Sequence, residues 1–204
     1  MNLLRISQYI TRFINIHFTA LPGNYRKRKV EILREFLQLS VEFLNRVDEE
    51  YWLDFGTLLG QHRENDIIPH DIDIDFAMHE KSYKNVLENK DLISPKIKFY
   101  DSSHRHRGPK LYFNYKGFDA DIYFYEDLGN HLRSYENADF ENERQEIPKN
   151  LIYPLKEVEF LDKKIFVPCG TKEYLEFVYG YIGIDGSRNS KTGFWEKRTY
   201  QRIN

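Results

Sequence analysis

Three aspartates stand at alternate positions within IIPHDIDIDFAM, residues 67–78. Asp is a poor strand residue, yet the rest of this stretch is typical of a buried β-strand. Because alternate side chains of a strand share one face, Ile72, Ile74 and Phe76 are expected to pack inward. The opposite face then carries the acidic side chains Asp71, Asp73 and Asp75. A row of like charges is unfavourable unless something positive lies over it, so the stretch predicts a cation-binding strand.

A second strand repeats this pattern in FDADIYFY, residues 118–125, where Asp119 and Asp121 share one face. Acidic strands that meet make a site for hard divalent cations, and Mg²⁺ commonly bridges carboxylates to substrate phosphates. Two such ions about 3.5–4 Å apart can clamp an in-line displacement at phosphorus. With a rise of about 3.3 Å per residue, Asp71 and Asp75 lie about 13 Å apart, so only adjacent aspartates can share one ion. A merely solvated strand face usually mixes Thr, Lys, Ser and Glu, which makes it the weaker alternative.

Periodicity predicts a mixed α/β or α+β single domain, with strands in the middle of the chain and helices at both ends. We expect helices over residues 3–18, 33–47, 80–92 and 171–180. We expect strands over 51–55 and 67–78, two strands over 110–126 that turn near Lys116 and Gly117, and a hairpin over 159–168. Residues 127–150 are predicted to be rich in loops.

The first helix is amphipathic and basic. Its apolar residues recur at helical spacing around Arg5 and Arg12, LPGN at 21–24 should end it, and the run RKRK follows at 26–29. It is not a secretory signal, because charges interrupt the apolar stretch and no small-residue cleavage site follows. Two hypotheses remain for it. One is a helix docked on the domain, and the other is a peripheral membrane contact through residues 1–29.

The overall charge excludes some partners. With 30 Lys and Arg against 32 Asp and Glu, no global field recruits nucleic acid, and no nucleic-acid partner is expected. No stretch of about 18 apolar residues exists, so no membrane-spanning segment is expected. Cys169 is the only cysteine and cannot form an internal disulfide. A reducing compartment therefore fits, and we expect a cytoplasmic location, with peripheral membrane association as the hypothesis above.

Three blocks of sequence follow one another in a recognisable order. The run WLDFGTLLGQHRENDIIPHDIDIDFAM, residues 52–78, holds a G-T-L-L-G turn, an Arg, I-P and the Asp-rich strand. Later come DADIYFY at 119–125 and YPLKEVEFLDKKIFVPCGTKEYLEFVYG at 153–180. Together they resemble the LicD/fukutin family over roughly residues 50–180, and the linked blocks are far more specific than any one alone.

The resemblance implies an α/β nucleotidyltransferase-like core related to polymerase beta, with a mixed central sheet flanked by helices. It divides the chain into N-terminal helices at 1–48, a catalytic domain at 49–182 and a C-terminal tail at 183–204 that packs on the domain. Family members transfer a phosphorylated alcohol, such as phosphocholine or ribitol phosphate, from a CDP-linked donor to a hydroxyl of a glycan or glycolipid. The products are a phosphodiester and CMP.

The resemblance also assigns roles to the aspartates. It implies that Asp73 and Asp75 are the metal pair for Mg²⁺, with Mn²⁺ as an alternative, and that Asp121 is the third carboxylate and general base. Asp71 would orient water or a ligand. Two departures stand out: His70 replaces a frequent Trp, and Asp119 is an additional acid two residues before Asp121. Whether Asp119 or Asp121 is the base stays open, although the following IYFY favours Asp121.

Donor binding is expected from residues around the acidic strands. Gly56 and Thr57 would approach the phosphates through backbone N–H groups and a hydroxyl, as helix starts can. Arg63 is the basic residue that matches the family, and its planar fork suits a phosphate, although an ion pair with an aspartate is nearly as good a prediction. In the basic cluster HRHRGPK at 104–110 we select Lys110 as a phosphate contact. Trp52 and Trp195 are expected in the core rather than as base-stacking platforms.

Two alternatives from other classes stay open. A nucleotidyltransferase that moves an NMP group would share the acidic triad and release pyrophosphate, but Gly56-Thr57 replaces the G-S turn of many such enzymes. A non-catalytic module that binds nucleotide or glycan is the second alternative. Such a module has no need of three converging carboxylates, which weighs against it.

Overall fold

A computed structural model describes residues 3–18, 25–136 and 145–198. Its centre is a seven-stranded sheet with the order β1-β2-β5-β4-β3, in which β6 pairs with β5 and β7 pairs with β6. The strands are β1 (Tyr51–Leu53), β2 (Asp73–His79), β3 (Lys98–Asp101), β4 (Lys110–Tyr115), β5 (Phe118–Asp127), β6 (His131–Ser134) and β7 (Ile147–Pro148). Strands β2 and β5 are parallel and the other neighbouring pairs are antiparallel. The sheet is therefore mixed, as expected from the sequence.

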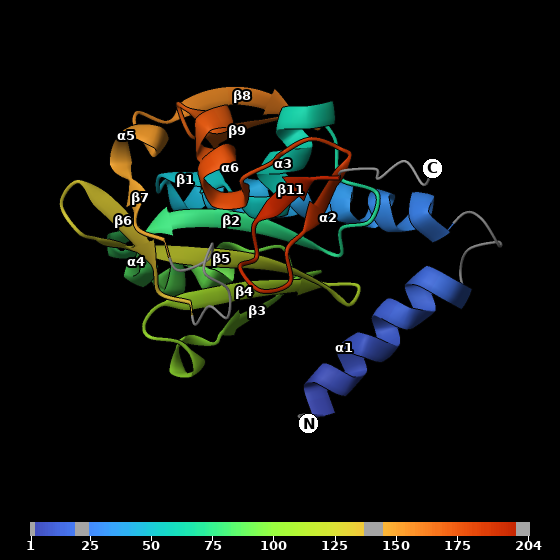
Figure 1. Cartoon of the computed structure of the whole chain (residues 1–204). Helices are drawn as coiled ribbons and strands as arrows, with labels where there is room; N and C mark the ends of the chain where they lie inside the picture. The colour runs from blue at the N-terminus through green and yellow to red at the C-terminus, as the bar shows by residue number, and fades with distance from the viewer. Residues whose placement is uncertain (1–2, 19–24, 137–144, 199–204) are drawn as a thin grey trace, which may run out of the picture.

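Helices surround this sheet, as Figure 1 shows. They are α1 (Leu3–Phe13), which continues as a π-helical turn (Ile14–Phe18), α2 (Tyr25–Val47), α3 (Phe55–Glu64), α4 (Tyr83–Glu88), α5 (Lys149–Ile152) and α6 (Thr171–Tyr179). Three short 3₁₀ segments are Glu80–Ser82, Lys90–Leu92 and Ser103–Arg105. Two small hairpins complete the described residues: β8 (Lys156–Phe160) with β9 (Lys163–Val167), and β10 (Gly186–Arg188) with β11 (Trp195–Lys197). The expected α/β class, with a mixed sheet flanked by helices, is confirmed.

The hydrophobic core lies between α2 and one face of the sheet. Leu33, Phe36, Leu37, Val41 and Leu44 of α2 are fully buried. The ring of Phe43 packs edge-on against Phe113 of β4 at 5.4 Å. On β2 and β5 the core positions are taken by alternate residues, including Ile74, Phe76, Ala120 and Ile122, all fully buried. Because strand side chains alternate, the acidic positions between them are left on the opposite face.

Most predicted elements are confirmed, with shifted bounds. The strand expected over 51–55 ends at Leu53, and the helix expected over 80–92 is α4 between two 3₁₀ turns. The turn between β4 and β5 has positive φ at Lys116 (50°) and Gly117 (88°), as such two-residue hairpin turns require. Within 127–150 the structure adds β6, β7 and the start of α5, and β3 and the β10–β11 hairpin were not expected. The helix break at 21–24 lies outside the described residues, and the domain boundaries stay predictions.

The strand expected over 67–78 begins only at Asp73, so its first half was predicted wrongly. Pro69 has no N–H for a sheet ladder, and the chain turns there, with Asp71 N donating to Ile68 O at 3.0 Å. Asp71 is therefore not part of the strand row. Ile72, expected to pack inward, is 45% exposed.

Helix α1 docks through its polar side at the β4–β5 turn. Arg12 donates to Gly117 O at 2.8 Å and lies 3.3 Å from Asp119 Oδ2. Asn15 Nδ2 donates to Lys116 O at 2.9 Å. In the described residues, no helix combines the length and apolar character that a membrane crossing requires.

The close approach of α1 to Gly117 yields a prediction. A Cβ on Gly117 would collide with the backbone of Arg12, whereas a Cβ on Gly129, also at positive φ (82°), would meet nothing within 4 Å. Both Gly→Ala changes should cost about 1 kcal/mol for the backbone conformation. Only Gly117→Ala should also free α1, and we expect hydrogen exchange of residues 5–15 to rise at least tenfold in that variant. Equal exchange of α1 in the two variants would contradict the docking contact.

Candidate active site

Three carboxylates converge on the face of the sheet opposite α2. In the parallel pairing of β2 with β5, Asp75 is the direct partner of Asp121, and Asp73 is two residues before Asp75. One oxygen each from Asp73, Asp75 and Asp121 lie within 4.8 Å of one another. Burial, reinforced by Asp121 and Asp71, raises the pKa of Asp73 to about 6, and burial beside Asp73 and Asp121 raises the pKa of Asp75 strongly. Such a cluster of oxygens fits a hard divalent cation.

Asp119 lies on the same face but is engaged elsewhere. It accepts a hydrogen bond from Asn114 Nδ2 at 2.7 Å and pairs with Arg12 at 3.3 Å. Burial raises its pKa, while Asn114 and Arg12 oppose that rise. Of the two candidate third carboxylates, the structure therefore places Asp121 with the cluster. The role of Asp121 as a base stays a prediction.

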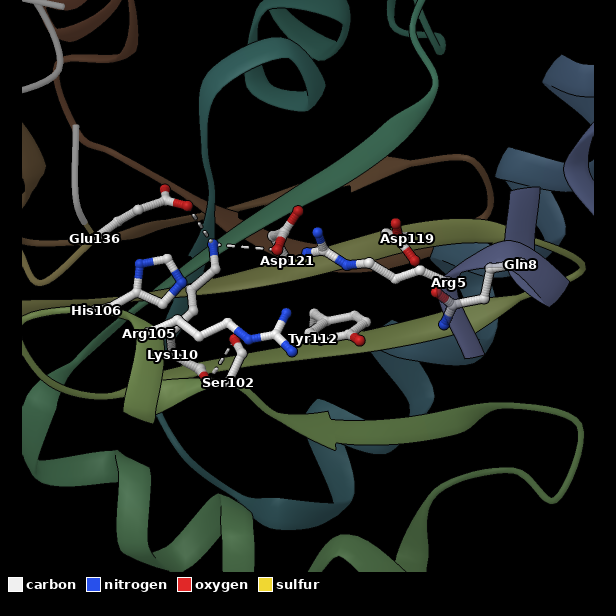
Figure 2. Close-up of a pocket in the computed structure, with 10 residues that line it drawn as sticks. All are labelled: Arg5, Gln8, Ser102, Arg105, His106, Lys110, Tyr112, Asp119, Asp121 and Glu136. Carbon is white, nitrogen blue, oxygen red and sulfur yellow. Dashed lines mark hydrogen bonds and ion pairs between the residues drawn. The ribbon is translucent and has the colours of Figure 1, made fainter. Parts of the chain in front are cut away.

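Lys110 supplies a buried positive charge to this cluster. Its side chain is 3% exposed, and Nζ lies 3.1 Å from Asp121 Oδ1 and 3.5 Å from Glu136 Oε1. Nζ also stands 3.2 Å from the centre of the Tyr123 ring, a cation–π contact. Figure 2 shows the ammonium between the two carboxylates. The predicted phosphate contact of Lys110 is untested, but its charge does reach the acidic face.

The start of α3 is fastened to β2 behind the carboxylates. Asp75 N donates to Thr57 Oγ1 at 2.9 Å, and Asp54 N donates to Asp75 O at 3.0 Å. Asp54 caps the helix by accepting from Phe55 N at 2.9 Å. Thr57 was expected to present its hydroxyl to a phosphate, and in the structure this hydroxyl positions Asp75.

A buried polar network that the sequence did not predict surrounds Asp54. Tyr125 donates its hydroxyl to Asp54 at 2.7 Å, and Tyr174 of α6 donates to the other carboxylate oxygen. Burial raises the pKa of Asp54 to about 6, and the two tyrosine hydrogen bonds oppose this rise. The network connects β5 and α6 to Asp54 at the start of α3. Asp54 is in turn bonded through its backbone to Asp75.

Gly56 and Asp71 approach each other closely at the other end of the acidic face. A Cβ on Gly56 would come 2.9 Å from Asp71 Oδ2, so a larger residue would displace that carboxylate. Burial raises the pKa of Asp71 to about 6, although the charges of Lys29 and Arg63 lower it. Asp71 therefore lies beside the start of α3, and its role in orienting water or a ligand stays a prediction.

Arg63 forms no ion pair with an aspartate in the described part of the chain and bonds to backbone carbonyls instead. Its Nε donates to Ile182 O at 2.7 Å and its Nη2 donates to Ile182 O and to Gly183 O, the latter at 3.0 Å. The side chain therefore ties the end of α3 to the segment after α6. Its predicted contact with a phosphate stays untested.

Two pockets open along the acidic face. The polar pocket, of about 260 Å³, is shown in Figure 2 and is lined by Arg5, Gln8, Ser102, Arg105, His106, Lys110, Tyr112, Asp119, Asp121 and Glu136. The aromatic pocket, of about 140 Å³, is lined by Gly56, Leu59, Arg63, Ile68, His70, Asp71, Tyr179, Tyr181, Gly183, Ile184 and Trp195. Asp121 faces one pocket and Gly56 with Asp71 faces the other. The cluster therefore borders the polar pocket through Asp121, and the aromatic pocket is bordered by Asp71, outside the cluster.

Several of these lining residues were not predicted. Trp52 is fully buried as expected, but Trp195 is half-buried and lines the aromatic pocket, so its assignment to the core was wrong. Arg5 and Gln8 enter the polar pocket from α1. The spacing of Arg5, Gln8 and Arg12 puts them on one helix face, a signal that the sequence offered.

Comparisons with known proteins point to one family. The family model described as "LicD/FKTN/FKRP, nucleotidyltransferase domain" matches residues 48–170. The chain is 32% identical over 158 residues to ribitol-5-phosphate transferase FKTN of Macaca fascicularis, and 31% identical over 158 residues to that of Homo sapiens. Each alignment covers 72% of this chain and 32% of the relative. The chain therefore spans about a third of the length of these relatives.

The crowded carboxylates yield a prediction about stability. The pKa of Asp73 is raised to about 6 in the folded protein, so this group favours folding while protonated, and that contribution is lost as the pH rises through about 6. Without divalent cations, Asp73→Asn should therefore have little effect near pH 4 and stabilise the protein by about 1–2 kcal/mol near pH 8.

Thermal melts in a chelator check this prediction. Asp91→Asn, at an exposed position, is the matched control and should change stability little at either pH. Added Mg²⁺ should stabilise the wild type more than Asp73→Asn, because a ligand that binds the folded state raises its stability. A difference between Asp73→Asn and wild type that does not vary with pH would contradict the raised pKa.

Proposed function

The chain belongs to the LicD/FKTN/FKRP family, and on that premise we propose that it transfers a phosphorylated alcohol from a CDP-linked donor to a hydroxyl of a glycan or glycolipid, with release of CMP. The observation that carries this proposal is the convergence of Asp73, Asp75 and Asp121 within 4.8 Å. The relatives are named ribitol-5-phosphate transferases, which supports ribitol phosphate as the first alcohol to test and leaves phosphocholine as the second. We propose the cytoplasm as the location.

The carboxylate cluster fits a divalent cation. Asp73, Asp75 and Asp121 would hold Mg²⁺, with Mn²⁺ as the alternative. Bound there, the cation would offset the negative charge of the donor diphosphate. The chain itself positions the carboxylates: Thr57 and the Asp54 network fix the strand that carries Asp75.

Asp121 is our candidate for the general base. It lines the polar pocket, so an acceptor hydroxyl entering there would meet this carboxylate. As Asp121 takes the hydroxyl proton, the acceptor oxygen forms a bond to the phosphorus that carries the alcohol. The bond from that phosphorus to the bridging oxygen breaks, and CMP leaves. A carboxylate has two oxygens and can serve both the cation and the proton.

The aromatic pocket suits the cytidine end of the donor. Tyr181 and Trp195 offer rings against which a base can stack. Ile184, 85% exposed, is an apolar residue at the pocket rim that a bound nucleoside would cover. Gly56 begins this wall, and the N–H groups of the first turn of a helix have no partner within the helix. Phe55 N is already bonded to Asp54, so we propose that the N–H groups of Gly56 and Thr57 receive phosphate oxygens of the donor.

The first test is release of CMP, measured with Mg²⁺ from CDP-ribitol, CDP-choline and CDP-glycerol. Asp73→Ala and Asp75→Ala should each reduce turnover on the order of a thousandfold, because each removes charge that organises the reacting phosphate. Asp91→Ala, at an exposed position, should retain activity.

The outcomes separate the open alternatives. Pyrophosphate from CTP or ATP would replace the proposal by NMP transfer. Donor binding without turnover, in the presence of glycan acceptors, would favour a binding module. Full activity in both aspartate variants would refute the metal site.

Asp121→Asn tests the base. Loss of a positioned base costs about 10²–10⁴ in rate, so kcat should fall by that factor while donor affinity changes little. Single-turnover rates and equilibrium binding of the donor give the two quantities separately. A variant with weakened donor binding and an unchanged chemical step would make Asp121 a ligand only.

A further inference from the structure

Helix α1 presents its apolar face to the outside of the molecule. We define the outward face as Leu3 (82% exposed), Tyr9 (60%), Ile10 (54%) and Phe13 (53%) of α1, together with Ile14 (43%) of the π-helical turn that continues it. At 3.6 residues per turn these positions share one side of the helix. They are five of the nine large apolar side chains that are exposed in the described residues, so this is a patch and not a scatter.

The inward face of α1 is polar. Arg12 bonds to Gly117 and Asp119, and Arg5 and Gln8 line the polar pocket beside the carboxylates. Figure 2 shows Arg5 extending from α1 into this pocket. A helix that docks only for stability buries its apolar stripe against the core and leaves its polar face in water. α1 has the reverse orientation. Burial of its apolar face by a partner would therefore contribute favourable free energy to binding.

The charge of this segment selects the partner. Residues 3–30 contain no Asp or Glu, and besides Arg5 and Arg12 on the inward face they contain the basic run RKRK at 26–29, of which Lys29 is buried. A second copy of this chain would bring the same positive charge to the contact and be repelled. An anionic lipid surface complements both features, since it accepts apolar side chains below a negatively charged layer of headgroups.

We propose that the outward face of α1 binds an anionic membrane surface. The helix lies outside the family-matched residues 48–170, so this surface is an addition to the matched domain. Because a helix with its side chains is about 10–12 Å across, the polar pocket behind it would lie about that distance from the lipid. The acceptor is then a glycan attached to a lipid. That consequence rests on the proposed function, whereas the lipid contact does not.

The test is co-sedimentation of the full chain with vesicles of phosphatidylcholine, with or without phosphatidylglycerol. The wild type should bind the anionic vesicles, with affinity that falls as salt rises. Ile10→Glu/Phe13→Glu should weaken binding about a hundredfold, because each change removes burial worth at least a factor of ten. The matched control is Leu92→Glu/Leu128→Glu, which alters exposed apolar residues away from α1 and should bind like the wild type.

The outcomes that overturn the proposal concern the lipid contact itself. Absence of wild-type binding to anionic vesicles would refute the lipid partner, as would equal binding by the α1 variant. A dimer in light scattering that Ile10→Glu/Phe13→Glu abolishes would assign the face to a second copy. Circular dichroism of each variant verifies folding. Lipid binding by a protein that turns over no CDP-linked donor would retain this inference and refute the proposed function.

Discussion

The mutual repulsion of three carboxylates is the constraint around which this structure is organised. Parallel pairing of β2 with β5 sets Asp75 beside Asp121, and Asp73 completes the cluster within 4.8 Å. Burial makes the repulsion stronger, as the raised pKa values of Asp73 and Asp75 reflect. Lys110 partly offsets this repulsion, because its ammonium lies 3.1 Å from Asp121. The site therefore holds unfavourable negative charge that a bound divalent cation would offset.

The two faces of the sheet have different roles: one forms the hydrophobic core, and the other carries the candidate active site. One face packs against α2 through alternate apolar residues, and the other holds the aspartates, Lys110 and both pockets. Elements far apart in sequence close the site. Arg12 ties α1 to the β4–β5 turn, and Arg63 ties α3 to residues 182 and 183. Both pockets therefore depend on residues outside the central strands.

The sequence predicted what depends on local pattern. The alternation of Asp with Ile and Phe in 72–76 was sufficient to place Asp73 and Asp75 on one face, and the second Asp pair indicated its partner strand. The start of the strand was predicted wrongly. The alternation of Asp with Ile begins at Asp71, but the chain turns at Pro69 and the strand begins only at Asp73. Long-range contacts carry no local signal: the spacing near Asp54 does not reveal Tyr174, 120 residues away. Trp195 reaches its pocket through an unexpected hairpin.

The parallel register of β2 and β5 has a consequence for how this chain can vary in length. A one-residue insertion within a paired strand shifts every later side chain to the opposite face of the sheet. In β5 such a shift would send Asp121 into the core and Ile122 into the site. Insertions within 118–123 should therefore be absent from functional descendants of this sequence. Loops tolerate added residues far better, since their closure cost grows slowly with length. Divergence in length is thereby directed to exposed turns such as the one joining β5 to β6, at 128–130.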